Sequence, residues 1–140
     1  MGILDKEIIR KHLREIEISM AYLKGKKNVG ENNLLKNIEE RFAVERALHL
    51  AIQNVIDIGN HILASLNINN VETYADIPVR LAEAGVISVK LARNLANMAK
   101  FRNMLVHEYV KVETRRLVLF LKNNLNDFEA FAHAIAKFTR

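Results

Sequence analysis

The sequence predicts an all-α protein, an up-and-down bundle of four main helices and one short helix. Apolar residues recur at spacings of three and four along nearly the whole chain, which is the period of helices with one buried side. The 140 residues include one proline and five glycines, and so few chain breakers favour helices over a many-stranded sheet. We expect residues 1–140 to form a single domain, since a chain of this length buries roughly two-thirds of its unfolded surface.

The first two helices are predicted from their apolar stripes. The segment KGKKNVGENN ends the first helix and forms a basic loop, and a long second helix is expected from about Leu34 to Leu66. The buried side of the first helix should consist of Ile9, Leu13, Ile16, Met20 and Leu23. That of the second should consist of Ile38, Phe42, Ile52, Ile56, Leu63 and Leu66.

The remaining helices are predicted from their ends. A short third helix begins near Asp76, with Pro78 in its first turn, where the missing N–H of proline is harmless. Gly85 is the expected C-terminal cap of this helix, and Ser88 the N-cap of a fourth helix. A fifth helix should run from about Glu113 to Phe138, with one apolar side.

Composition restricts the surroundings and the partners. The chain has no cysteine, which excludes disulfides and thiolate metal sites and fits a cytoplasmic location. Its first residues are rich in charge, unlike a signal peptide, and no apolar run approaches the roughly 18 residues that span a bilayer, so we expect no membrane partner. The net charge of +5 favours a polyanionic partner.

Arg102 interrupts the apolar seam of the fourth helix. A guanidinium on such a face is rarely fully buried without a partner, because its desolvation costs on the order of several kcal/mol. One interpretation is that Arg102 extends to the edge of the bundle or caps a neighbouring helix. The other is that it belongs to a functional site. The seam consists of Leu91, Leu95, Met98, Arg102, Leu105 and Tyr109.

His107 and Tyr109 make the functional interpretation stronger. On a continuous helix, Tyr109 would lie about 20° from Arg102, whereas His107 would lie about 140° away. One straight helix therefore cannot direct all three side chains to one place. We expect the helix to end near His107, with β-branched residues at 110, 112 and 114 in a non-helical link, unless a second subunit supplies the missing side.

The stretch RNMLVHEY, with the pattern Arg-x4-His-x-Tyr between two long helices, resembles the signature of HEPN-domain ribonucleases. In particular, the chain resembles the HepT-type toxins of bacterial and archaeal toxin–antitoxin pairs. The segments FAVERALHLAIQNVIDIGNHIL, YADIPVRLAEAGVIS and RNMLVHEY follow each other in the order of the family, over nearly the whole chain. Arg102, Asn103, His107 and Tyr109 all match the family motif.

The resemblance implies a HEPN-like fold and a metal-independent ribonuclease that acts as a homodimer, with two motifs facing a shared cleft. Arg102 and His107 would be catalytic, and Asn103 would support them. Tyr109 would accept AMP from a small nucleotidyltransferase antitoxin of the MntA type, which neutralises the toxin. No cofactor and no metal ligands are implied.

The residue types suit this chemistry. Without a metal, RNA cleavage uses the 2′-OH as nucleophile and needs a base with a near-neutral pKa and a cation at the phosphorane. His107 can supply the base or acid, and Arg102 can hold a phosphate through two hydrogen bonds. The reaction needs one group that removes a proton and another that donates one, and the motif of each chain has a single histidine. This is a physical reason to expect a second motif from a partner subunit.

A row of polar residues on the second helix has two interpretations that stay open. Glu45, His49, Gln53, Asp57 and His61 follow each other at spacings of four. They either line the cleft or meet a partner, or they form ordinary side-chain pairs within the helix, each worth a few tenths of a kcal/mol. A metal site is disfavoured, because the Glu-x-x-His pairs of four-helix carboxylate sites are absent from the sequence. Arg115 and Arg116 are candidates for contacts with the RNA backbone.

Two other functions compete with a ribonuclease. The chain could be a non-catalytic helical module that binds nucleotides or accompanies a nucleotidyltransferase. It could also be a helical adaptor in which Arg102 and His107 are structural. Cleavage of bulk RNA in EDTA, and its loss in His107→Ala, separates these alternatives.

Overall fold

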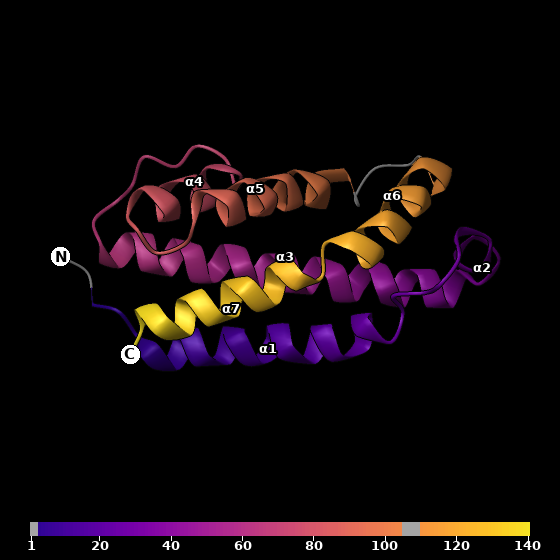
Figure 1. Ribbon diagram of the computed structural model, residues 1–140, viewed down its shortest axis with the longest axis horizontal. Helices are drawn as coiled ribbons and strands as arrows, with labels where there is room; N and C mark the ends of the chain where they lie inside the picture. Colours follow the sequence, from indigo (N-terminus) through magenta and orange to yellow (C-terminus); the bar gives the residue numbers. More distant parts are fainter. Residues whose placement is uncertain (1–2, 105–109) are drawn as a thin grey trace.

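The computed structural model describes residues 3–104 and 110–140, and within these ranges every regular element is a helix (Figure 1). This confirms the predicted all-α class. The helices are α1 (Lys6–Lys24), α2 (Glu31–Lys36), α3 (Ile38–Ser65), α4 (Asp76–Glu83), α5 (Val89–Met104), α6 (Val110–Asn123) and α7 (Asn126–Phe138).

Helix α3 is the centre of the bundle. It contacts α1, α2, α4, α5 and α7, and Figure 1 shows α4 and α5 on one side of it and α1 and α7 on the other. Helix α1 starts and α7 finishes at the same end of the bundle, because the two run antiparallel. No helix in the described ranges is both long and apolar enough to cross a membrane. The largest fully buried side chains include Phe128, Phe131, Leu48, Ile52 and Ile62.

Several predicted helix ends are confirmed by their hydrogen bonds. The Ser88 hydroxyl accepts from the backbone N–H of Leu91 at 3.1 Å, as expected of an N-cap. Gly85 has φ of +78°, and the N–H of Val86 donates to the carbonyl of Leu81 at 2.9 Å, which is the Schellman pattern of helix termination. Pro78 lies buried in the first turn of α4.

The predicted second helix is wrong in its continuity, because it is divided at Asn37. Asn37 is extended, with φ of −107° and ψ of 92°; its N–H ends α2, and its side chain accepts from Glu40 N at 3.1 Å to start α3. Ile38 and Phe42 were expected in the core, yet they are 53% and 55% exposed. Both lie in the first turns of α3.

The predicted fifth helix is wrong in both its start and its continuity. Helix α6 already begins at Val110, so the expected non-helical link does not include the β-branched residues 110, 112 and 114. Their helix cost of a few tenths of a kcal/mol is smaller than the gain from burying Leu117 and Leu121 on the same helix. A tight turn at residues 124–125 then separates α6 from α7.

Candidate active site

Arg102 lies in the last turn of α5, after the buried Leu95 and Met98 of the same seam. Its guanidinium carbon is 5.2 Å from the centroid of the Tyr74 ring. Its Nε is buried, and no residue of the described ranges accepts a hydrogen bond from it. Buried donors without acceptors are rare and cost free energy, so Arg102 is not placed here for the hydrogen bonding of its Nε within the described residues.

Tyr74 stands on a segment that is fixed by local hydrogen bonds. The Asp76 carboxylate accepts from the backbone N–H groups of Glu72 and Thr73, at 2.9 and 3.0 Å. These bonds lower the pKa of Asp76. Arg80 Nε donates to the carbonyl of Asn70 at 3.1 Å. The segment between α3 and α4 therefore holds the Tyr74 ring against the guanidinium of Arg102.

His49 of α3 lies within electrostatic reach of Arg102. Burial lowers the pKa of His49, and the positive charges of Arg102 and Arg46 lower it further. The imidazole is therefore neutral at pH 7 and can accept a proton.

Glu45 lies one turn before His49 and close to α6. Burial raises the pKa of Glu45 above its ordinary value, the charge of Arg41 opposes this rise, and the nearby Glu113 carboxylate adds to it. Arg41 Nε is 3.6 Å from Glu45 Oε1. Glu113 is itself 9% exposed. Residues from α3, α5 and α6 thus combine three cations (Arg41, Arg46 and Arg102), a neutral histidine and two carboxylates.

The polar row of α3 does not lie on one face. Residues four apart advance by about 400°, so each step turns the side chain by about 40°, and the whole row turns by about 160°. Asp57 accepts a hydrogen bond from Gln53 at 2.9 Å, and His61 Nε2 accepts from the backbone N–H of Asp5 at 3.0 Å, at the start of α1. The structure places Glu45 and His49 near Arg102 or α6, whereas His61 ties the N-terminal segment to α3.

The other candidates lie at the edges of the described residues. Asn103 belongs to the last turn of α5, and the predictions for His107 and Tyr109 fall outside the described residues. Arg115 is exposed on α6, with Nε 3.8 Å from Glu31 Oε2 of α2. Arg116 is exposed on the same helix.

Sequence reasoning missed Tyr74, Arg46 and Glu113. Tyr74 left one signal, since it is an aromatic residue in the otherwise polar turn segment NNVETYAD and remains 42% exposed. Arg46 and Glu113 look like ordinary charged helix residues in the sequence. Only the folded structure brings Arg46 near His49 and Arg102, and Glu113 of α6 near Glu45 of α3.

The all-α bundle is the class of fold that the sequence predicted, whereas the histidine that the structure places near Arg102 is His49 and not His107 of the motif, which falls outside the described residues. The family model described as "Ribonuclease HepT-like" matches residues 6–135. The chain belongs to this family, which confirms the resemblance drawn from Arg102, His107 and Tyr109.

Two curated relatives are nucleases by name. The chain is 26% identical over 132 residues to the tRNA nuclease HepT of Aphanizomenon flos-aquae, which covers 94% of this chain and 90% of the relative. It is 32% identical over 80 residues to the mRNA nuclease HepT of Shewanella oneidensis, which covers 57% of this chain and 60% of that relative.

Solved structures share the fold. A tri-AMPylated HEPN toxin of Shewanella oneidensis, in complex with an MNT antitoxin, has a TM-score of 0.82 and 24% identity, and the match covers 93% of this chain and 97% of the toxin. The cytosolic protein YutE of Bacillus subtilis, of unknown function, also has a TM-score of 0.82, with 22% identity and coverage of 99% and 92%.

Proposed function

We propose that this chain is a ribonuclease toxin of a toxin–antitoxin pair and that it cleaves RNA without a metal ion. Membership of the ribonuclease HepT-like family supports this proposal, as do the two relatives named as nucleases of tRNA and of mRNA. The observation that carries it is Arg102, whose buried Nε has no acceptor among the described residues and whose guanidinium packs on Tyr74. A phosphate oxygen is the acceptor that fits this group best.

In the proposed reaction the ribose 2′-OH loses its proton and attacks the adjacent phosphorus. The bond from phosphorus to the 5′-oxygen breaks, the leaving oxygen takes up a proton, and a 2′,3′-cyclic phosphate remains. Arg102 stabilises the negative charge that develops on the phosphorane oxygens. His107 acts as base or acid, and Asn103 orients it or holds a phosphate oxygen.

His49 extends this assignment. Burial and the charge of Arg102 lower the pKa of its imidazole, and in this proposal His49 lines the cleft beside Arg102. Glu45 lies one turn before His49, and its carboxylate interacts with the positive charge of Arg41. Arg115 and Arg116 are exposed on α6 and would contact the RNA backbone.

The active form in this proposal is a homodimer with a composite cleft. The support is chemical, since each chain brings one motif histidine and the reaction needs both a base and an acid. The partner that regulates it is a nucleotidyltransferase antitoxin, which attaches AMP to Tyr109. The Shewanella relative in its complex with an MNT antitoxin is tri-AMPylated. An AMP phosphate near Arg102 would occupy the place of the substrate phosphate.

The test is cleavage of bulk RNA by the purified protein in EDTA. Arg102→Lys should keep the fold and lose about 100-fold or more in rate, because an ammonium cannot make the planar pair of hydrogen bonds to a phosphorane. Arg93→Lys, at an exposed arginine of the same helix, is the matched control and should cleave like the wild type.

His107→Ala should also remove cleavage. Equal rates for Arg102→Lys and the wild type would contradict the role of Arg102 as a phosphate clamp. No cleavage by the folded wild-type protein at any concentration would instead favour the non-catalytic module that binds nucleotides or accompanies a nucleotidyltransferase.

A further inference from the structure

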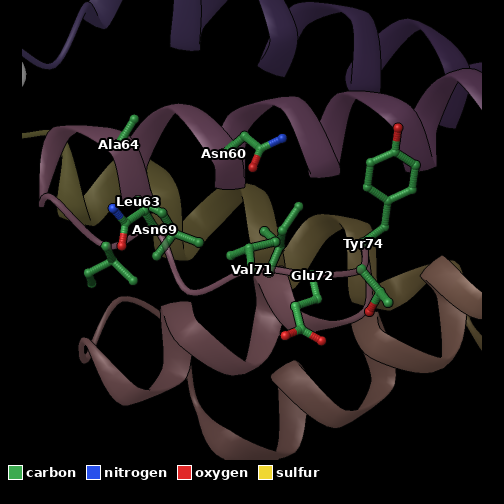
Figure 2. A pocket seen from close by; sticks show the side chains of 10 residues that line it. Asn60, Leu63, Ala64, Asn69, Val71, Glu72 and Tyr74 are labelled. Carbon is green, nitrogen blue, oxygen red and sulfur yellow. The ribbon is translucent and has the colours of Figure 1, made fainter.

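A cavity of about 750 Å³ opens between α3, the segment that follows it and the start of α4. Its volume lies within the range of roughly 300–1,000 Å³ that is common for small-molecule sites. Figure 2 shows it from close by. Among the residues that line it are Asn60, Leu63, Ile68, Val71, Tyr74 and Ile77.

The lining of this cavity suits a flat ring with a polar edge. Leu63, Val71 and Ile77 give apolar walls, and Asn60 adds an amide that can both donate and accept hydrogen bonds. Figure 2 shows the Asn60 amide and the Tyr74 hydroxyl on the α3 side of the segment, while Glu72 points away from α3. The lining residues include no lysine and no arginine, so the cavity offers no cation to a phosphate.

Tyr74 connects this cavity to Arg102. The same side chain lines the cavity and packs 5.2 Å from the guanidinium carbon of Arg102. A phosphate held by Arg102 and a ring bound in the cavity would therefore be separated by one aromatic side chain. In a nucleotide, the phosphate and the base are separated by a single ribose.

We propose that this cavity binds the base of the nucleotide next to the phosphate held by Arg102. The link to Arg102 rests on the proposed ribonuclease function, whereas binding of a base in the cavity does not. Tyr74 stacks with the bound nucleotide, and Asn60 contacts the edge of the base. Stacking of this kind is worth enough to change affinity by about tenfold or more for each base.

The cavity is built before any ligand arrives. Asp76 holds the N–H groups of Glu72 and Thr73, and Arg80 holds the carbonyl of Asn70. The wall that carries Tyr74 is thus fixed by three hydrogen bonds to α4. A preformed wall reduces the conformational entropy lost on binding.

The first test measures whether the base contributes to binding. Calorimetric titration of the wild-type protein with AMP, GMP, CMP and UMP is compared with titration by ribose 5-phosphate, which has the phosphate and sugar but no base. We expect the tightest nucleotide to bind about tenfold more tightly than ribose 5-phosphate. Equal affinity for all five compounds would overturn the proposal.

Variants of the cavity test whether the affinity advantage of a nucleotide over ribose 5-phosphate arises there. Ala64→Trp puts an indole into the cavity from an exposed position of α3, and it should remove the tenfold advantage of the nucleotide. Ala130→Trp, at an exposed alanine of α7, is the matched control and should keep the advantage. Asn60→Leu provides a second disruption at an exposed residue, in case Ala64→Trp does not fold. The same advantage in the wild type and in both cavity variants would overturn the proposal.

RNA cleavage separates this inference from the proposed function. If the wild type cleaves RNA, Ala64→Trp should change which bases flank the cut sites, and Ala130→Trp should not. Unchanged cut sites in Ala64→Trp would overturn the inference while the ribonuclease function stands. If the wild type cleaves no RNA, the proposed function fails, and the titrations alone decide whether the cavity binds a base.

Discussion

The contacts of Arg102 can be compared with the free energy that its unpaired buried donor costs. A cation–π contact such as that with Tyr74 stabilises by about 0.5–2 kcal/mol. A buried donor without an acceptor, as at its Nε, costs about 1–3 kcal/mol. The two ranges overlap, so this contact and this unpaired donor together give Arg102 little net stabilisation. The proposed phosphate contact would give the arginine a reason that folding stability alone does not.

We therefore expect Arg102→Leu to keep the free energy of unfolding within about 1 kcal/mol of the wild type, or to increase it, because leucine fits the seam and removes the unpaired donor. Urea unfolding followed by circular dichroism measures this. Met98→Ala, at a buried seam residue, is the positive control. It should lower the free energy of unfolding by about 2–5 kcal/mol. A loss above about 2 kcal/mol in Arg102→Leu would support the structural adaptor instead.

His49 makes stability depend on pH. Since the pKa of His49 is lowered in the folded protein, the unfolded chain binds its proton more readily. Its contribution to stability is then complete above the ordinary pKa of 6.5 and declines as the pH falls through 6.5 toward the lowered value. The raised pKa of Glu45 acts in the opposite direction, because the folded protein binds that proton more readily as the pH falls.

His49→Gln should accordingly reduce the loss of stability between pH 7.5 and about pH 5.5, because glutamine does not titrate. Urea unfolding at several pH values gives the slope. His133→Gln, at an exposed histidine of α7, is the control and should keep the slope of the wild type. Identical slopes in all three proteins would show that His49 is not held neutral by its surroundings.

At the scale of the helices, the sequence predicted the ends that have a local chemical cause. Ser88 and Gly85 act through their own backbone neighbours, so residue type and position sufficed. The breaks at Asn37 and at residues 124–125 interrupt segments whose helical period continues across them, and the apolar pattern does not reveal such breaks. Ile38 and Phe42 were misplaced because the apolar pattern of one helix does not show which of its residues a neighbouring helix covers.

Some residues of the candidate site could likewise be predicted from the sequence, and others could not. Arg102 is conspicuous in the sequence because a charge in an apolar seam breaks a pattern. In the sequence, Glu45 and His49 belong to the same row as Asp57 and His61. Each step along that row turns the side chain by about 40° around the helix, so its two ends face different neighbours in the structure. Tyr74 and Glu113 owe their positions to contacts between distant segments, which no spacing rule contains.

Gly59 controls how closely α4 approaches α3. A Cβ at this position would lie 2.4 Å from Cγ2 of Ile77 and 3.3 Å from Cδ1 of Leu81. Gly59→Ala gains up to about 1 kcal/mol of helix propensity. Overpacking of a well-packed core costs about 1–3 kcal/mol, so we expect a net loss of stability. A shift of α4 would also disturb the Tyr74 segment and should weaken the proposed binding of a base in the cavity.

A double-mutant cycle of Gly59→Ala and Ile77→Ala, with the free energy of unfolding measured by heat or urea, tests this close approach of α4 to α3. Ile77→Ala removes the methyl group that the new Cβ would meet, so Gly59→Ala should cost less in that background than in the wild type, or even stabilise it. Additive effects of the two substitutions would contradict the close contact.

At the scale of the whole molecule, a composite cleft predicts complementation between damaged chains. When Arg102→Ala and His107→Ala chains are mixed, each is inactive alone, and a mixed dimer should regain part of the cleavage if one chain supplies the arginine and its partner the histidine. Single-turnover cleavage, together with sedimentation at micromolar concentration, measures this.

Two controls complete that experiment. Mixing Arg102→Ala chains with Arg102→Lys chains should restore nothing, since no chain then carries an intact arginine. Sedimentation as a monomer only, at concentrations where the wild type cleaves RNA, would contradict the proposed homodimer.

The antiparallel course of α1 and α7 determines how the bundle would respond to mechanical force. The start of α1 and the finish of α7 lie at the same end of the molecule (Figure 1), and the two helices contact each other and line one groove. Tension applied through Asp5 and Thr139 would separate this pair from one end, one turn after another, so that only a few contacts carry the load at any moment. The ion pair between Lys24 and Glu129, at the far end of the pair, would be among the last to part. This protein should therefore open at low force when pulled by its ends, and resist far more when the same force shears α1 along α7.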